Sequence, residues 1–230
     1  MRRLAALVLT SGALALAGCG GGASITPGSG AGGGRAPQSS SLNSTAAWSV
    51  YNYNAANTSL TPKSASFDGT TATFSFQAGV YTSRLTTNAK PLTGDLTGKT
   101  LTDTVTVTGA TAPFQTHFGG GCGNPPAVRF FFVTQQRGGF AYTNYWWSNP
   151  MSYVLANGTA TLTASLADPH QWSDFNGQFG DTDAATQAAF LAATADVQSV
   201  GLSFGGDCFF ENGATTPDGS GTFSSRFSES

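Results

Sequence analysis

The sequence predicts an all-β protein, a β-sandwich of jelly-roll type with one short helix near residues 183–198. Charged residues make up only 10% of the 230 residues, which disfavours a protein built from helices with Lys- and Glu-rich surfaces. Several segments alternate polar and apolar residues with a period of two, as half-buried strands do. Clusters of Gly, Pro, Asn and Asp separate these segments, and strands do not alternate with helices.

The first 44 residues precede the predicted domain. Residues 1–18 have a short basic start and an apolar run that is too short for a membrane span, a pattern typical of an export signal. Residues 19–44 are rich in Gly and Ser and nearly free of large apolar side chains, so we expect a flexible tether. The β-sandwich domain is then expected over residues 45–230.

The end of the signal segment reads Leu16-Ala17-Gly18-Cys19 and resembles the lipobox of bacterial lipoproteins. The resemblance implies that the Cys19 thiol carries lipid, including palmitate, and that the chain is cut just before this residue. It implies a membrane-anchored protein, and Gly20 in place of Asp favours the outer membrane of a Gram-negative bacterium. An ordinary secretory signal, in which Cys19 is incidental, is the alternative.

Six segments carry the strand pattern, and one segment breaks it. The expected strands cover residues 71–76, 104–108, 129–133, 159–166, 200–204 and 222–227. Residues 183–198 hold several Ala and few β-branched residues, so a helix is expected there, capped by Asp181 or Asp183. We expect this helix to lie across an edge or end of the sandwich.

Two cysteines remain once Cys19 is assigned to lipid. Cys122 and Cys208 lie in Gly-rich turns, and an even pair in an exported protein predicts a disulfide. A metal pair and two free thiols are the alternatives, although no CxxC or HxxxH spacing accompanies the two residues.

The aromatic cluster at Tyr142, Tyr145, Trp146 and Trp147 is the candidate ligand-binding site. On a strand the two tryptophans face opposite sides, so one can enter the core while the other is exposed or covered by a loop. Flat aromatic rings beside Asn, Thr and Ser suit the C–H faces and hydroxyls of a sugar ring. Plain core and edge packing of these aromatic residues is the alternative.

Acidic residues offer two weaker kinds of site. Asp174, Asn176, Asp181 and Asp183 could supply oxygen ligands to a structural Ca²⁺, but the segment lacks the EF-hand pattern and no cofactor is expected. A glycosidase needs a pair of carboxylates, whereas the only glutamates are Glu211 and Glu229. Asp168, Asp174, Asp181, Asp183 and Asp207 could contribute, but all lie in turn-like contexts where Asp is expected for the turn itself. No catalytic constellation is therefore predicted. The net charge of −2 argues against a nucleic-acid partner.

Several stretches together resemble the galactose-binding-like and laminin-IV-like jelly rolls used by many carbohydrate-binding modules. They are residues 96–101, Tyr145-Trp146-Trp147-Ser148, Trp172 with Gly177, Phe190, and residues 200–206. Together with the lipobox, this resemblance implies a lipid-anchored envelope module that binds polysaccharide without catalysis, although no ligand residue carries over from it by a specific motif. A structural or adhesive module without a small-molecule ligand is the second interpretation, and a hydrolase acting on glycans is the third.

Overall fold

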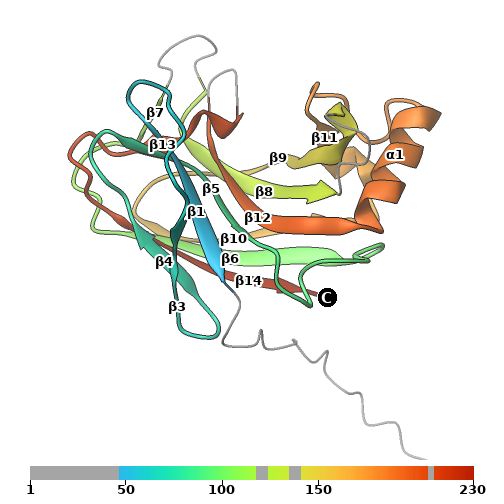
Figure 1. Ribbon diagram of the computed structural model, residues 1–230, viewed down its shortest axis with the longest axis horizontal. Coiled ribbons are helices and arrows are strands. Elements are labelled where there is room, and N and C mark those ends of the chain that lie inside the picture. Colours follow the sequence, from blue (N-terminus) through green and yellow to red (C-terminus); the bar gives the residue numbers. More distant parts are fainter. Residues whose placement is uncertain (1–46, 118–123, 135–140, 207–209) are drawn as a thin grey trace, which may run out of the picture. The chain divides into compact units, whose positions relative to one another are not determined.

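The computed structural model describes residues 47–117, 124–134, 141–206 and 210–230. In these residues, antiparallel strands form two sheets that pack on one another (Figure 1). One α-helix, α1 (Ala184–Thr194), lies at the end of the sandwich beside the short strand β11 (Trp172–Asp174). The predicted all-β sandwich with one short helix is therefore confirmed.

The larger sheet has nine strands. Its main path runs in the order β11, β9 (Tyr145–Val154), β8 (Ala127–Thr134), β12 (Val197–Gly205), β5 (Val80–Thr87), β1 (Trp48–Asn54) and β2 (Lys63–Ser64). Two short strands lie off this path: β13 (Ala214–Thr215) pairs with β5 and with β7 (Gln115–Thr116). The strands β11 and β2 therefore mark opposite edges of the larger sheet.

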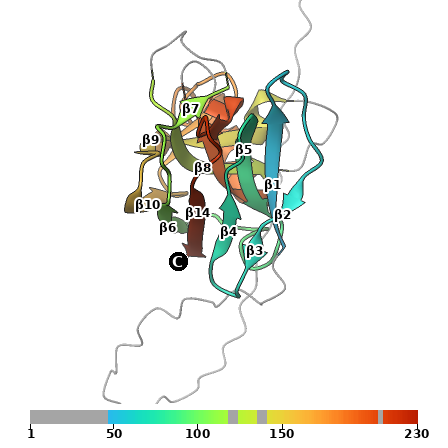
Figure 2. The same cartoon turned by 90° about the vertical axis from the view of Figure 1, so that its left-hand side faces the viewer.

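The smaller sheet has five strands, which Figure 2 shows following one another. Their order is β10 (Gly158–Ser165), β6 (Thr100–Thr108), β14 (Thr222–Glu229), β4 (Ala72–Ser75) and β3 (Ser66–Phe67). The last strand in the sequence, β14, therefore lies in the middle of this sheet. Each of the six segments predicted as strands overlaps one of the observed strands β4, β6, β8, β10, β12 and β14.

The alternating segments bury one face, as predicted. Along β6, Leu101, Val105 and Val107 are buried, whereas the threonines between them are partly exposed. The hydroxyls of Thr106 and Thr159 lie 2.9 Å apart on the solvent side of the neighbouring strands β6 and β10. The small sheet thus turns its apolar side chains toward the larger sheet and its hydroxyls toward water.

The core between the sheets is rich in aromatic side chains near α1. The Phe132 ring centroid lies 5.1 Å from that of Trp172 and 6.5 Å from that of Trp146. Phe190, from α1, lies 5.0 Å from Trp146 and is fully buried. These contacts fix the helix to the end of the sandwich, because truncating such a ring costs about 3–5 kcal/mol.

Helix α1 begins where the sequence predicts and ends earlier. Asp183 has an extended backbone, and its Oδ1 accepts a hydrogen bond from Thr186 N at 2.8 Å, which is the geometry of an N-cap. The helix ends at Thr194, and Val197 already belongs to β12, so the predicted end at residue 198 is wrong. Val197 instead exchanges backbone hydrogen bonds with Gly94, at 2.7 and 2.9 Å.

Among the described residues, no helix is long and apolar enough to cross a membrane.

Candidate functional site

The two tryptophans of β9 lie on opposite faces of the larger sheet, as strand geometry requires. Trp146 faces the interior, and its Nε1 donates a hydrogen bond to the Thr143 carbonyl at 2.8 Å. Trp147 lies on the outer face, with its ring centroid 5.0 Å from that of Phe131 on β8. One strand therefore supplies both the core and the outer surface with an indole.

Both tryptophans are nevertheless buried: Trp146 exposes 0% and Trp147 only 6% of its surface. Of the two alternatives for the outward-facing tryptophan, exposure to solvent is wrong, and cover by another segment is what the structure shows. A second aromatic layer covers Trp147, formed by Phe175 at 5.9 Å and Tyr145 at 6.5 Å between ring centroids. Neither tryptophan is itself an open platform in this structure.

The exposed rings at this position are Tyr142 and Phe175, which expose 47% and 50% of their surfaces. Their centroids lie 5.8 Å apart and their planes are tilted by 38°. Tyr145 is half-buried and meets the Phe175 ring at 5.8 Å in an edge-to-face arrangement. We call Tyr142, Tyr145 and Phe175 the aromatic patch.

A tight turn after β11 presents Phe175. The Asp174 carboxylate is buried, and its Oδ1 accepts hydrogen bonds from Asn176 N at 2.8 Å and Gln178 N at 2.9 Å. Phe175 N donates to the Tyr142 carbonyl at 3.3 Å, so the backbone ties the two exposed rings together. The patch is thus held by hydrogen bonds on the edge of the larger sheet.

Phe175 is the member of the patch that is not among the residues predicted from the sequence. It lies in Asp174-Phe175-Asn176-Gly177, where the Asp and Asn side chains suggest oxygen ligands. A large apolar side chain among polar turn residues cannot easily reach the core. That local contrast was the available signal for an exposed ring.

The carboxylates considered as calcium ligands form other interactions. Asp174 holds the turn just described, Asp183 caps α1, and Asp181 lies 3.0 Å from the His170 Nδ1. The hydrogen bond from Thr186 N also lowers the pKa of the Asp183 carboxyl. Asn176 is exposed, and the described residues contain no group of three His, Cys, Asp or Glu side chains that could hold a metal ion.

An ionic cluster lies farther along the same outer face. Arg84 on β5, Ser203 on β12 and Arg129 on β8 occupy one register row. Glu211, from the turn η3 (Phe210–Asn212), places its Oε1 3.6 Å from the Arg84 Nε. The Arg84 guanidinium also lies 4.6 Å above the Tyr51 ring, a cation–π distance.

Burial governs the ionisation of this cluster. It raises the pKa of Glu211, and the positive charges of Arg84 and Arg129 oppose that effect. Burial lowers the pKa of Arg129 to about 9, opposed by the negative charge of Glu211, so the guanidinium is still charged at neutral pH. The cluster therefore sets one carboxylate against two guanidiniums, and this attraction ties η3 to the sheet.

Rings and charges join into one layer across the outer face. Trp147 packs against Phe131 at 5.0 Å, and the Arg84 guanidinium lies 5.7 Å from the Phe131 ring. Between Phe131 and β5, the register position on β12 is Gly201, which has no side chain. The aromatic patch is the exposed end of this layer.

The two glutamates serve different sheets. Glu211 is paired with Arg84 on the larger sheet, whereas Glu229 at the end of β14 lies 2.9 Å from the Lys99 Nζ. They do not form the pair of facing carboxylates that glycoside hydrolysis uses.

No family model, no curated protein and no solved structure matches this chain. The patch is therefore interpreted from its own geometry and chemistry.

Cys19, Cys122 and Cys208 lie outside the described residues. The lipid attachment and the disulfide stay predictions.

Proposed function

We propose that this protein is a non-catalytic binding module of the bacterial cell envelope and that it binds glycan through the aromatic patch. The observation that carries the proposal is the pair Tyr142 and Phe175, which together present two adjacent half-exposed rings. Single exposed apolar side chains are common on protein surfaces, whereas grouped ones are typical of interaction surfaces. The ring faces would receive the C–H face of a sugar.

Polar groups beside the rings supply the second half of such a site. Asn176 and Gln178 flank Phe175 and are exposed, while Asn144 is partly exposed next to Tyr145. Their amides both donate and accept hydrogen bonds, which matches the double role of a sugar hydroxyl. Because Asp174 fixes the turn, little ordering of the backbone would be needed on binding.

The cellular location in this proposal is based on the first 44 residues of the sequence. A lipid on Cys19 and a tether over residues 19–44 would hold the sandwich near the outer membrane while leaving it free to reach polysaccharide. The resemblance of sequence stretches to jelly-roll carbohydrate-binding modules, described above, is a further ground for the same proposal.

The test is a glycan-array screen of the full-length protein, followed by titration of the best ligand. Phe175→Ala and Tyr142→Ala should each weaken binding at least about tenfold, the equivalent of about 1.4 kcal/mol at a central aromatic contact. Leu191→Ala is the matched control, because Leu191 is an apolar side chain of α1 with 47% exposure and lies outside the patch.

Two outcomes would contradict the proposal. One is an array on which no glycan binds, and the other is equal binding by Phe175→Ala and Leu191→Ala. Thermal unfolding of each variant must match the wild type, so that a loss of binding is not a loss of fold.

A structural or adhesive role is the second candidate, and the edge strand β10 favours it. This strand is the end of the smaller sheet, and its eight residues include no charge and no proline. Such an edge lacks the usual protection against pairing with another strand. In that case, exposed backbone of β10, and not the aromatic patch, would make the contact.

A further inference from the structure

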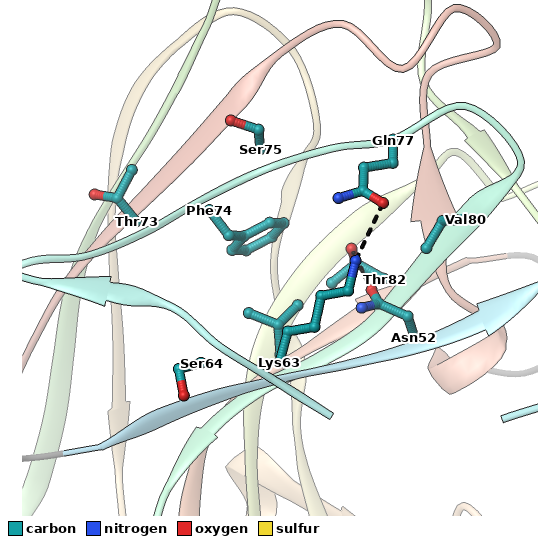
Figure 3. A pocket seen from close by; sticks show the side chains of 10 residues that line it. Asn52, Lys63, Ser64, Thr73, Phe74, Ser75, Gln77, Val80 and Thr82 are labelled. Carbon is teal, nitrogen blue, oxygen red and sulfur yellow. Dashed lines mark hydrogen bonds between the residues drawn. The ribbon is translucent and has the colours of Figure 1, made fainter. Parts of the chain in front are cut away.

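A cavity of about 190 Å³ opens between the two sheets at the edge opposite the aromatic patch. The larger sheet contributes β1, β2 and β5, and the smaller sheet contributes β4. Figure 3 shows side chains from these strands surrounding one space. Its volume is below the range of about 300–1,000 Å³ for sites of drug-sized ligands, so it suits a molecule no larger than one sugar.

The floor of the cavity is polar and ordered. Asn52 and Thr82 are both buried, and the Thr82 hydroxyl donates a hydrogen bond to the Asn52 Oδ1 at 3.0 Å. This contact fixes the amide so that its nitrogen, with two donor hydrogens, lies on the side of the cavity (Figure 3). The floor therefore presents donors to an incoming group.

The rim carries the charge. Lys63 on β2 is exposed, and its Nζ reaches the Gln77 Oε1 at 3.4 Å (Figure 3). That contact uses one of three ammonium hydrogens and leaves the Gln77 amide hydrogens as further donors. Phe74 forms an apolar wall on the β4 side.

The lining thus has one cation, two amides and no carboxylate. Its one charged group is positive and its two amides offer N–H donors, which favours a ligand that is rich in acceptors and negatively charged. We propose that this cavity binds the carboxylate group of a small ligand, placed between the Lys63 ammonium and the Asn52 amide. The inference does not rest on the proposed function, because it uses other residues at the other edge of the larger sheet.

Titration calorimetry of the full-length protein tests the proposal with three probes. Sodium D-glucuronate and sodium succinate carry a carboxylate, and D-glucose is the neutral counterpart of glucuronate. At least one carboxylate should bind, and glucose should bind at least about tenfold more weakly, because charge-assisted hydrogen bonds are the stronger ones. Tighter binding of glucuronate would identify an acidic sugar as the source, and tighter binding of succinate a free organic acid.

Variants link the binding to the cavity. Lys63→Gln should weaken binding of the carboxylate at least about tenfold, whereas Lys63→Arg should retain most of it. Asn52→Asp keeps the acceptor for Thr82 and places a negative charge on the floor, so it should abolish binding. Lys90→Gln is the control, because it removes the same charge from an exposed loop that does not line the cavity.

The proposal is overturned if neither carboxylate binds, if glucose binds as well as glucuronate, or if Lys63→Gln binds like the wild type. Lys63 lies on the exposed rim, so this variant keeps the test decisive even where Asn52→Asp fails to fold.

Discussion

Asp103 is fully buried at an inward position of β6, between the buried residues Leu101 and Val105. The Ser225 hydroxyl donates a hydrogen bond to its Oδ2 at 2.6 Å, and no described residue pairs with its Oδ1. Burial raises the pKa of this carboxyl to about 7, against the lowering effect of Ser225 and the Arg226 backbone. Folding therefore favours the protonated, neutral acid.

This pKa makes the stability of the domain depend on pH. Between about pH 4 and pH 7 the folded state holds a proton that the unfolded chain has lost, so the free energy of unfolding falls as pH rises. The contribution is complete below pH 4 and lost above pH 7, on the order of 4 kcal/mol in total. Urea unfolding of wild type and Asp103→Asn across pH 4–8 should show a much flatter profile for the variant.

Glu211 titrates in the same direction, because burial also raises its pKa. The slope of the wild-type pH profile contains the effects of both carboxyls. The effect of Asp103 is therefore the difference between the profiles of wild type and Asp103→Asn. Parallel profiles for wild type and Asp103→Asn would contradict the assignment.

At the scale of elements, Gly201 sets how closely β12 approaches β5. A Cβ atom there would meet the Leu85 carbonyl oxygen and lie 2.8 Å from the Thr86 Cα. Both contacts are with backbone, which cannot move aside as a flexible side chain can. The close pairing of β12 with β5, two central strands of the larger sheet, therefore requires a glycine at this position.

Gly201→Ala should lower the free energy of unfolding by about 3 kcal/mol, because it overpacks a strand interface. Ser203→Ala, two residues along the same strand, is the control. The Ser203 hydroxyl is buried without a hydrogen-bond partner among the described residues, so its removal should change stability little. Denaturant titration measures the free energy of unfolding of both variants. Equal values for Gly201→Ala and Ser203→Ala would show that β5 and β12 can move apart at no cost in stability.

The strands that alternation predicts, such as β6 and β10, have one solvated face, whereas β8 is buried on both faces and is recognisable only as an apolar run. Along β6 and β10, threonines alternate with buried apolar residues, and this alternation is visible in the sequence. Along β5 it is not, because Leu85 is buried on the inner face and Thr86 on the outer face. A strand covered on both sides carries no polar–apolar alternation to detect.

The candidate site could also be predicted only in part from the sequence. Strand geometry alone places Trp146 and Trp147 on opposite faces. It does not reveal that Phe175, from a different strand end, covers Trp147, because that contact depends on the pairing of β11 with β9. Local pattern thus located the aromatic strand, and tertiary packing decided which rings are exposed.

At the scale of the whole molecule, the predicted lipid anchor is expected to determine where the protein is located and not how the sandwich folds. Cys19 precedes the described sandwich, so Cys19→Ala should leave thermal unfolding of the domain unchanged. Metabolic labelling with a palmitate analogue should mark the wild type and not this variant, because the thiol is the predicted attachment site. Equal labelling of both proteins would remove the lipoprotein assignment.

The position of β14 has a consequence for the order of events during synthesis. It is the last strand in the printed sequence, yet it pairs with β6 on one side and with β4 on the other. Until residues 222–229 are available, the smaller sheet is two separate hairpin-like fragments with open edges. Pairings between distant parts of a chain form slowly, and waiting edges are prone to aggregation. The sandwich therefore cannot close progressively from its amino-terminal side, because the smaller sheet is joined only once residues 222–229 are available.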